Sequence, residues 1–499
     1  MLRKQQYKLS IMLCLILLWG PASSWGETLE QGWAAFEAEK FSKAFEIWKP
    51  LAEKGSAGAQ YYLGKAYSEG KGVAQDMKEA AAWYQKAADQ GHPAAQNDLG
   101  FLYMNGLGVV PSVEVAYKWL NLSAASGYQD AIKGLEFLRS KMTVAQLAET
   151  EAKLGWLYQR GWIVQKDAKE AARWYLMAAN KGHVSSQFKL AEMFYLGDGI
   201  KQDFAIAHRW FSAAALNGHP AAQMNLAKMY MQGEGVEKNL DTAYSWLFVA
   251  SVFGIPGADK EAELIKQQLT EHQYAVALNR IGVFYQQGMG LEQDLKQALQ
   301  FYQQSAALGY ASAQYNLGLA FQTGIAGKRN TAQAFEWYQR AAEQDHMLAQ
   351  INLATLYQKG ILGKPDIAEA IKWYTKAAQH GSSTAQVKLG MIYYLGEGVE
   401  QDVEKAQIWF EKAALLGHPR AFEVLGRIYY LGHGVDQDDV VAYKWFALAK
   451  AAGDQAPNAA MDVMLARMSD REIEKGKKLA MKWRGKRENV QPTGAMPEQ

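Results

Sequence analysis

The sequence predicts an all-α solenoid, a stack of helical hairpins that recurs about every 36 residues. Three observations support this fold class. An apolar anchor recurs at one position of the period, a glycine follows each anchor after seven residues, and a tryptophan or phenylalanine follows after twenty. A period of this length indicates stacked units that bury their apolar faces against their neighbours. The anchors are Leu63, Leu99, Leu154, Leu190, Leu226, Ile281, Leu317, Leu353, Leu389 and Leu425.

The first helix of each unit is predicted around the anchor. In residues 58–91, Ala59, Leu63 and Ala66 recur at three- and four-residue spacing, which gives an apolar face at the helical period. Gly70 is expected to end this helix, because glycine adopts the left-handed C-terminal conformation at little cost. The corresponding glycines are Gly106, Gly161, Gly197, Gly233, Gly288, Gly324, Gly360, Gly396 and Gly432.

The second helix is predicted to begin six residues after each glycine, at a residue type that caps helix N-termini by accepting a backbone N–H. These caps are Asp76, Ser112, Asp167, Asp203, Asn239, Asp294, Asn330, Asp366, Asp402 and Asp438. In four units with an aspartate cap, Asp76 with Glu79 among them, a Glu or Gln three residues later extends the pattern toward a capping box. The aromatic residues of the second helices are expected to fill the space between units.

The repeated residues resemble the Sel-1-like repeat, a relative of the tetratricopeptide repeat. The pattern Ala-Gln-x-x-Leu-Gly-x-x-Tyr, then Gly-x-Gly-Val, then Ala-x-x-Trp-Tyr-x-x-Ala-Ala-x-x-Gly covers residues 58–453 and is plainest at 385–417. The resemblance implies a right-handed α-solenoid, a superhelix of antiparallel helix pairs. It also implies an adaptor or scaffold role, often in bacterial envelopes or at host contacts, and no shared reaction. Residues 33–55 fit an earlier partial unit more loosely.

Two insertions of 19 residues, after the second and fifth units, divide the repeats into blocks. An extended second helix is expected before each insertion and in the last unit, followed by a helix that begins at Thr143, Thr270 or Ser469. The joints are expected to be packing devices, and the alternative is that they form clefts. The blocks are residues 27–142 with a partial and two full units, 143–269 with three units, and 270–485 with five units and capping helices.

Both ends of the chain are expected to lie outside the repeats. Residues 1–26 predict a secretory signal peptide, because a basic start precedes a short apolar stretch and then small residues. The apolar stretch, Ile11 to Trp19, is too short to cross a bilayer as a helix. The mature protein is therefore expected in the periplasm or outside the cell. Residues 486–499 lack periodic apolar residues and predict a disordered tail.

Composition excludes several classes of function. Cys14, within the predicted leader, is the only cysteine, so no disulfide, thiolate metal site or cysteine nucleophile is expected in the mature chain. The leader holds three of the 53 basic residues and none of the 51 acidic ones, so cleavage would leave a net charge near −1. Net charge therefore implies neither nucleic acid nor an anionic membrane as a partner. No integral membrane segment is expected after cleavage.

Histidines and glycine pairs in the turns do not predict a ligand site. The Gly-x-Gly pairs join two helices and lack the third glycine of a phosphate-binding loop. His92, His183, His219 and His418 each follow a helix-ending glycine. Units about 8–10 Å apart cannot share a metal whose ligands lie about 2 Å from it, so these are predicted to be turn residues. We therefore expect no metal and no cofactor.

Two Ser-x-x-Lys tetrads match part of the penicillin-binding enzyme motif. They are Ser68–Lys71 and Ser186–Lys189, and neither has a recognisable Ser-Asp-Asn or Lys-Thr-Gly partner. The tetrads are attributed to chance, so no catalytic residue is assigned and the protein is predicted not to be an enzyme.

A candidate partner-binding face lies opposite the anchors. At about 100° per residue, positions −2, +2 and +5 from an anchor point away from it. More than half of these thirty positions are apolar, and aromatic and methionine side chains are typical of interfaces. The alternative is that neighbouring helices bury this stripe. The candidate partner-binding residues are Tyr61, Phe101, Trp156, Phe188, Tyr195, Met231, Tyr315, Met391, Tyr394 and Tyr430.

These observations predict a secreted or periplasmic scaffold that binds a protein partner of unknown identity on the concave face of the superhelix. A host-interaction, virulence-type factor is one form of this prediction. Replacing Trp156 and Tyr195 with alanine is expected to weaken partner capture while changing the melting temperature little. The alternative is a cell-envelope enzyme or glycan-binding protein that acts on peptidoglycan or polysaccharide. That alternative requires a polar pocket, which would lie at the joints near residues 128–152 or 255–279.

Overall fold

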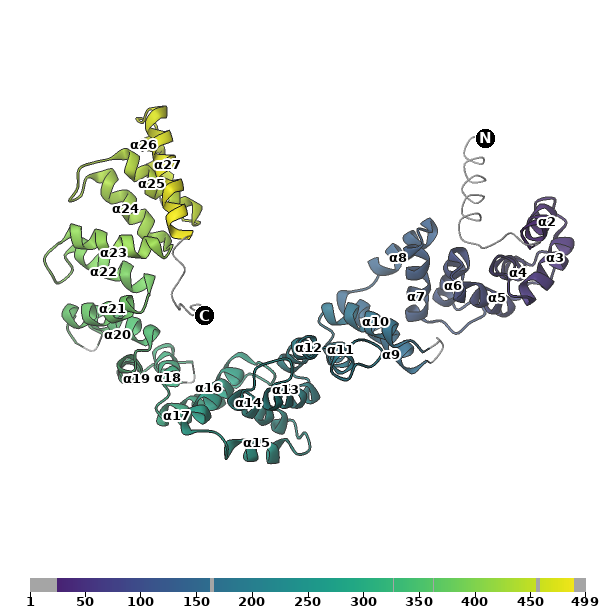
Figure 1. Ribbon diagram of the computed structural model, residues 1–499, viewed down its shortest axis with the longest axis horizontal. Helices are drawn as coiled ribbons and strands as arrows, with labels where there is room; N and C mark the ends of the chain where they lie inside the picture. Colours follow the sequence, from purple (N-terminus) through teal and green to yellow (C-terminus); the bar gives the residue numbers. More distant parts are fainter. Residues whose placement is uncertain (1–24, 162–165, 326, 362, 455–457, 489–499) are drawn as a thin grey trace. The chain divides into compact units, whose positions relative to one another are not determined.

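A computed structural model describes residues 25–161, 166–325, 327–361, 363–454 and 458–488 (Figure 1). These residues form 26 α-helices joined by turns, and none of them lies in a β-strand. The chain folds as two compact units. The first unit comprises the chain up to Met229 together with the segment Gly233–Glu237. The second comprises Tyr230–Gln232 and the chain from Lys238 onward.

Helices of the first unit follow one another as antiparallel hairpins. They are α2 (Trp25–Glu37), α3 (Phe41–Glu53), α4 (Ala57–Glu69), α5 (Met77–Asp89), α6 (Pro93–Asn105), α7 (Val113–Ala125), α8 (Gln129–Ser140), α9 (Val144–Arg160), α10 (Ala168–Asn180), α11 (Val184–Leu196), α12 (Phe204–Leu216) and α13 (Pro220–Gln232), whose last residues belong to the second unit. The α2–α3 hairpin coincides with the looser partial repeat at residues 33–55.

Helices of the second unit continue the same pattern. They are α14 (Leu240–Val252), α15 (Ala258–Lys266), α16 (Glu271–Gln287), α17 (Leu295–Ala307), α18 (Ala311–Thr323), α19 (Thr331–Glu343), α20 (Met347–Lys359), α21 (Ile367–Gln379), α22 (Ser383–Leu395), α23 (Val403–Leu415), α24 (Pro419–Leu431), α25 (Asp439–Ala451), α26 (Asn458–Leu465) and α27 (Asp470–Glu488).

Each first helix ends as the sequence predicts. All ten unit glycines adopt left-handed φ values between 59° and 77°, a region in which other residues are strained. All ten predicted caps also accept a backbone N–H with their side chains. Two sequence signals therefore fix both sides of every turn.

The expected capping boxes at the second helices are wrong. A capping box requires a free N–H on the cap residue, but the Asp76 N–H already donates to the Tyr67 carbonyl across the turn. In the three other pairs the N–H groups of Asp167, Asp294 and Asp366 also donate to a tyrosine carbonyl across the turn. Complete boxes occur instead at the joints, where Thr143 pairs with Gln146 and Thr270 pairs with Gln273.

The core of each hairpin is formed where the second helix crosses the first. Gly318, one residue after its anchor, lies under the ring of Tyr338, and a Cβ atom there would approach the ring to 2.6 Å. Gly390 and Phe410 have the same relation, also at 2.6 Å. Small residues on the first helix thus allow a buried aromatic ring from the second helix to pack against its backbone.

Each joint contains a separate short helix, so the expected extension of the second helix is wrong. Helices α7 and α14 end at their usual positions, because Gly127 and Gly254 follow them with φ of 79° and 70°. The inserted residues form α8 and α15. Thr143 and Thr270 then begin the long helices α9 and α16, as predicted, and the last turn before α27 contains Ser469.

The joints restore the packing of the regular stack. Helix α9 contacts α7 and α16 contacts α14, so the inserted helices do not separate the helices on either side. An ion pair links the same two positions at both joints, Glu114 with Lys153 at 2.9 Å and Asp241 with Arg280 at 2.6 Å. This arrangement fits the expectation that the joints are packing devices.

The two predicted end segments are covered only in part. Residues 1–24 of the predicted signal peptide lie outside the described residues, and Trp25 and Gly26 begin α2. Helix α27 continues to Glu488, three residues beyond the expected start of the tail, and residues 489–499 lie outside the described part.

Candidate functional site

The candidate stripe occupies three different environments, one for each of its positions. Its ten residues lie on eight helices, α4, α6, α9, α11, α13, α18, α22 and α24, and are not brought together in one pocket. Each position is therefore considered separately.

Position −2 is a contact between consecutive hairpins. The ring of Tyr61 stacks on His92 of the next hairpin, with ring centroids 4.7 Å apart. Phe188 stacks on His219 at 4.2 Å, and Tyr315 stacks on the equivalent histidine at 4.8 Å. Phe188 is buried, with 8% of its surface exposed. These three candidates thus hold the stack together, as the alternative interpretation of the stripe expected.

The stacked histidines are N-caps of the first helices. Nδ1 of His92 accepts the Ala95 N–H at 3.3 Å, and His219 and His346 cap their helices in the same way. Because only the neutral ring can accept this bond, protonation would remove the cap. Burial lowers the pKa of His92 to about 4 and also lowers the pKa values of His219 and His346. The histidines are structural, and His92 and His219 lie in the turns as predicted.

The residue type at position +5 varies together with the residue type 21 positions after the anchor, in the second helix. Where that residue is tyrosine, position +5 holds an acceptor for its hydroxyl; where it is phenylalanine or leucine, position +5 holds tyrosine or methionine. The polar pairs are Tyr84–Ser68, Tyr175–Gln159, Tyr302–Gln286, Tyr338–Gln322 and Tyr374–Gln358. The apolar pairs are Leu120–Met104, Phe211–Tyr195, Leu247–Met231, Phe410–Tyr394 and Phe446–Tyr430.

The tyrosines at position +5 make further contacts inside the fold. The Tyr195 hydroxyl donates to Glu234 at 2.7 Å, and the Tyr394 hydroxyl lies 2.8 Å from Nδ1 of His433. The Arg467 guanidinium lies over the ring of Tyr430. Like Met231, these candidates are half-buried. The tyrosines therefore have structural partners, and we now expect Tyr195→Ala to lower stability.

Of the three stripe positions, +2 holds the one candidate that is classed as exposed, Trp156. Trp156 is 40% exposed, while Phe101 and Met391 are half-buried. The position one turn further along, +6, is exposed in all ten hairpins and was missed by the choice of positions opposite the anchor. Together, positions +2 and +6 of the first helices are called the open row.

Three leucines of the open row are the functional candidates that the sequence reasoning missed. Leu196, Leu395 and Leu431 stand at position +6 and are 68%, 60% and 51% exposed. The signal was present, since each is the centre of a Tyr-Leu-Gly sequence at a helix end. More than half of the surface of each of these leucines is therefore open to solvent.

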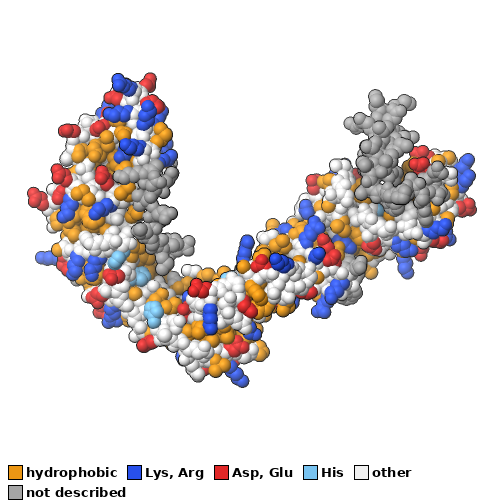
Figure 2. All heavy atoms as spheres, in the orientation of Figure 1, with side chains coloured by type: hydrophobic (Ala, Val, Ile, Leu, Met, Phe, Trp, Pro, Cys, Tyr) orange, Lys and Arg blue, Asp and Glu red, His pale blue; other side chains and the backbone are white. Residues whose placement is uncertain are grey.

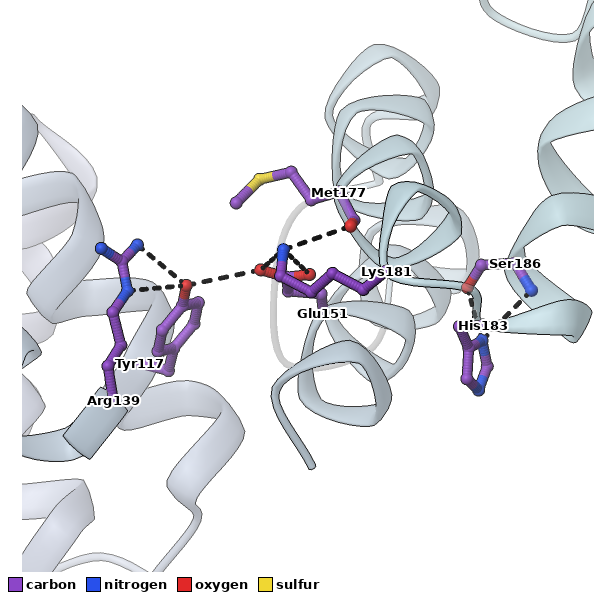
Figure 3. A network of polar contacts seen from close by, with 7 residues as sticks. All are labelled: Tyr117, Arg139, Glu151, Met177, Lys181, His183 and Ser186. Atoms are coloured by element: carbon purple, nitrogen blue, oxygen red, sulfur yellow. Dashed lines mark hydrogen bonds and ion pairs between the residues drawn. The ribbon is translucent and has the colours of Figure 1, made fainter. Parts of the chain in front are cut away.

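The first joint contains a buried polar network (Figure 3). The Glu151 carboxylate, with no exposed side-chain surface, accepts Nζ of Lys181 at 2.9 Å and the Tyr117 hydroxyl at 3.5 Å. Arg139 donates to the Tyr117 oxygen from two nitrogens, at 3.0 and 3.3 Å. At the second joint, leucines replace Glu151 and Lys181 at the same repeat positions, Leu278 and Leu308. The buried Glu151 carboxylate is thus paired within the fold, and the network occupies a structural position.

Ser186, His183 and Glu149 follow one another like a nucleophile, a base and an orienting acid. His183 Nδ1 lies 2.9 Å from the Ser186 hydroxyl, and Nε2 lies 3.1 Å from Glu149 (Figure 3 shows the first pair). However, Ser186 is 1% exposed, which leaves no room for a substrate. The same histidine cap forms where the serine is alanine, as at His92 and Ala95. The contact is therefore a helix cap.

Neither Ser-x-x-Lys tetrad forms a functional pair. Lys189 pairs with Glu192 at 2.8 Å and Lys71 pairs with Glu69 at 2.8 Å. Ser68 bonds to the Tyr84 hydroxyl at 3.2 Å. In the described ranges, no group of three His, Asp or Glu residues is arranged to hold a metal ion. Nor does any described helix have the length and apolarity to cross a membrane.

The stacked hairpins define a helical-repeat protein. Ten copies of the Sel1 repeat match it, at residues 57–92, 93–128, 148–183, 184–219, 220–251, 275–310, 311–346, 348–382, 383–418 and 424–454. The matches cover more than half of the chain, so the chain belongs to the Sel1 repeat family. Proteins of this family are generally protein-interaction scaffolds and are typically not catalytic.

Solved structures include related repeat proteins. The chain is similar to c5321, described as a protective antigen of uropathogenic Escherichia coli with an SLR fold, with 28% identity over 91% of this chain and 99% of that one and a TM-score of 0.33. It is also 28% identical to a Sel1 repeat protein from Oxalobacter formigenes over 53% of this chain and 99% of that one, with a TM-score of 0.36. No curated protein matches the chain. The family assignment rests on the ten repeats.

Proposed function

We propose that this protein is an exported scaffold that captures a protein partner on the open row of its first helices. The observation that carries the proposal is the pair Leu395 and Leu431, which are one period apart on neighbouring hairpins and are 60% and 51% exposed. A contiguous exposed apolar patch with a polar rim is typical of a protein-binding surface. Hydrophobic side chains are visible at the surface of the C-terminal hairpins in Figure 2.

The patch lies on a rigid support. Met391 precedes Leu395 by one turn on α22, and the intervening Tyr394 faces inward, where its ring meets Phe410 edge-on at 6.4 Å. The Tyr394 hydroxyl joins α22 to the turn after α24. The leucines can therefore contact a partner without loss of the hairpin core, which makes them preferred anchors over the tyrosines.

Charged residues lie on α24, the helix that ends with Leu431. The Glu423 carboxylate is buried, with Arg420 at 3.1 Å and Arg427 also in contact. Both arginines are about half exposed, so their remaining donors face solvent. A partner with apolar side chains and carboxylates at its rim fits this surface. Such charges affect association rate and specificity more than affinity.

Export is supported by the amino-terminal sequence. A basic start, a short apolar stretch and small residues precede α2, and no cysteine remains beyond the leader to require a reducing compartment. We place the scaffold in the periplasm or outside the cell. A host-interaction role is one form of the same proposal, in which the partner on the open row is a host protein.

Site-specific photocrosslinking in intact cells tests the proposal. A photoreactive residue at position 395 or 431 is expected to capture one partner, and the same residue at 408 is the control. Ile408 lies on α23, a second helix, and is 54% exposed, so it matches the leucines in exposure but not in location. Equal capture at all three positions, or no capture at 395 and 431, would contradict the proposed surface.

A further inference from the structure

In three hairpins, position +5 bonds to the residue after the C-terminal glycine of the next hairpin. Tyr195 bonds to Glu234, and two pairs in the second unit follow the same 39-residue spacing: Gln358 Nε2 donates to Glu397 at 2.8 Å, and the Tyr394 hydroxyl lies 2.8 Å from His433. The bond links successive hairpins on the side where the first helices end.

Two consecutive hairpins lack this link although they hold the donor. The residues 39 positions after Gln286 and Gln322 are Ile325 and Ile361, which cannot accept a hydrogen bond. These isoleucines are 42% and 45% exposed. Within the described residues, the side-chain nitrogens of Gln286 and Gln322 have no hydrogen-bond acceptor.

The direction of both free amide groups is fixed. The Tyr302 hydroxyl donates to Oε1 of Gln286, and the Tyr338 hydroxyl donates to Oε1 of Gln322 at 2.5 Å. Each bond holds the carbonyl end of the glutamine toward the second helix, so the nitrogen points to the opposite side. Gln358, held in the same way by Tyr374, shows where that nitrogen points when an acceptor is present.

A small hollow lies beside the first of these donors. Gln286, Leu319, Thr323 and Ile325 line it together with parts of Tyr302 and of the intervening helices, and its volume is about 70 Å³. An Asn316–Asn279 hydrogen bond of 2.9 Å shows that α16 and α18 are in direct contact at this place. The hollow thus offers an amide donor and an apolar wall to one small side chain or backbone segment.

Repeat spacing matches an extended polypeptide. Packed helices lie about 8–10 Å apart, and an extended chain advances about 3.1–3.4 Å per residue. Every third carbonyl of such a chain would therefore meet the donor of the next hairpin. An α-helical ligand would rise only about 4.5 Å over three residues and would not keep this register.

Charge around the two turns is positive. Lys328, Lys359 and Lys364 are exposed and form no ion pair in the part of the chain that the structure describes. Arg329 is also exposed, and its Nε donates to the Thr323 carbonyl. The acidic residue in these turns, Asp366, is engaged as the cap of α21. An acidic ligand therefore complements this edge.

We propose that the ends of α16, α18 and α20 hold an extended, acidic polypeptide segment, with carbonyl oxygens on the amide groups of Gln286 and Gln322. Its small apolar side chains contact Ile325 and Ile361, and its carboxylates face the lysines of the two turns. The proposal rests on the scaffold function and specifies the chemistry of one partner segment.

Fluorescence anisotropy with a labelled peptide of repeated Glu-Val-Ser triplets tests the proposal. The full chain is expected to bind this peptide and to bind a Lys-Val-Ser peptide of equal length at least tenfold more weakly. The double substitution Gln286→Glu and Gln322→Glu keeps the acceptors for Tyr302 and Tyr338, removes the donors and adds two negative charges that repel an acidic ligand. It is expected to weaken binding about tenfold or more, as the loss of two hydrogen bonds implies. Gln159→Glu, in another tyrosine–glutamine pair, is the matched control and should bind normally.

A second variant separates binding from folding. Ile325→Glu with Ile361→Glu supplies the acceptors that other hairpins have, so it is expected to remove peptide binding without lowering the melting temperature. Unchanged affinity of the Gln286→Glu, Gln322→Glu protein, equal affinity for both peptides, or no binding by the unmodified protein would each overturn the proposal. Crosslinking at 395 and 431 is independent of these residues, so it distinguishes failure here from failure of the scaffold function.

Discussion

The hairpins α18–α19 and α22–α23 make the same first-helix surface by different chemistry. In the former, Tyr338 donates to Gln322 at 2.5 Å; in the latter, the Phe410 ring lies against Tyr394, with centroids 6.4 Å apart. Both arrangements place an aromatic ring over a glycine, Gly318 or Gly390. A tyrosine or methionine at position +5 therefore indicates that the residue at +21 of the second helix is phenylalanine or leucine, and it does not by itself indicate a binding surface.

This difference changes where function is sought. The aromatic candidates at −2 and +5 have partners inside the stack, whereas Leu395 of the open row is 60% exposed, and the side-chain nitrogen of Gln322 has no acceptor among the described residues. Leu395 and Gln322 are thus stronger candidates than the aromatic residues that dominate the apolar stripe. The predictions below test this division in order of expected effect.

Removing the aromatic ring of Tyr338 or of Phe410 should change the free energy of unfolding more than any other substitution considered below. Tyr338 and Phe410 are both fully buried, so Tyr338→Ala and Phe410→Ala should each lower the free energy of unfolding by about 3–5 kcal/mol. Chemical denaturation of the full chain measures the change. Similar losses in the two variants would show that the ring is common to both kinds of hairpin, and a negligible loss in either would contradict the shared core.

Adding a hydroxyl to the ring of Phe410 should have an intermediate effect on the free energy of unfolding, and the size of this effect should depend on the residue at position +5. Phe410→Tyr places a buried hydroxyl opposite Tyr394 and should cost about 1–3 kcal/mol if it stays unsatisfied. The double variant Phe410→Tyr, Tyr394→Gln recreates the Tyr338–Gln322 pair and should recover most of that loss. A double-mutant cycle measures the coupling, and additive effects would show that the two positions are independent.

Acid should destabilise the α20 cap but not the α22 cap. Burial lowers the pKa of His346, whereas the α22 cap, Ser382, does not titrate. Because the pKa is lower in the folded state, the stabilisation by neutral His346 is present above the unfolded pKa near 6.5. It is lost as the pH falls from there toward the folded pKa, by at most about 1.4 kcal/mol per pH unit.

Chemical denaturation of the His346→Ser variant and of the unmodified chain, each at neutral and at mildly acidic pH, measures how much unfolding free energy each protein loses on acidification. The variant is expected to lose less stability on acidification. An unchanged pH dependence would show that His346 does not stay neutral in the folded state. His92, whose pKa burial lowers to about 4, should show the same sign of effect in the first unit.

Open-row leucines should have the smallest effect on stability. Leu395→Ser and Leu431→Ser change exposed side chains, so each should alter the free energy of unfolding by no more than about 0.5 kcal/mol. Calorimetry checks this, with Ile408→Ser as the matched exposed substitution. A large loss of stability from either leucine would mean that it packs within the fold.

Local features of the fold were predictable because they depend on a few adjacent residues. Gly70 and Asp76, and their equivalents, defined the turns, since left-handed backbone and N-cap geometry each demand particular residue types. The inserted helices differ from the prediction because Gly127 and Gly254 follow the ends of α7 and α14 inside the expected extended helices. The role of the Asp76 N–H, bonded to Tyr67 across the turn, was not visible in a capping-box pattern.

The candidate site was predictable only in part, because facing away from an anchor does not establish exposure. Tyr61 and Phe188 point away from their anchors but stack on the next hairpin. The pairing of positions +5 and +21 could have been found by comparing the ten repeats with one another, as could the Tyr-Leu-Gly helix ends. The orientation of the Gln322 amide depends on its contact with Tyr338 in the second helix, which no local sequence pattern predicts.

Adjacent substitutions on α22 test the central claim most directly. Tyr394→Ala and Leu395→Ala should be compared for unfolding free energy and for crosslinked capture at position 431. We expect Tyr394→Ala to lower stability by more than about 1 kcal/mol, because it loses an aromatic contact and a hydrogen bond. Leu395→Ala should leave stability nearly unchanged and strongly reduce capture. Reduced capture by Tyr394→Ala at full stability, with normal capture by Leu395→Ala, would contradict the account.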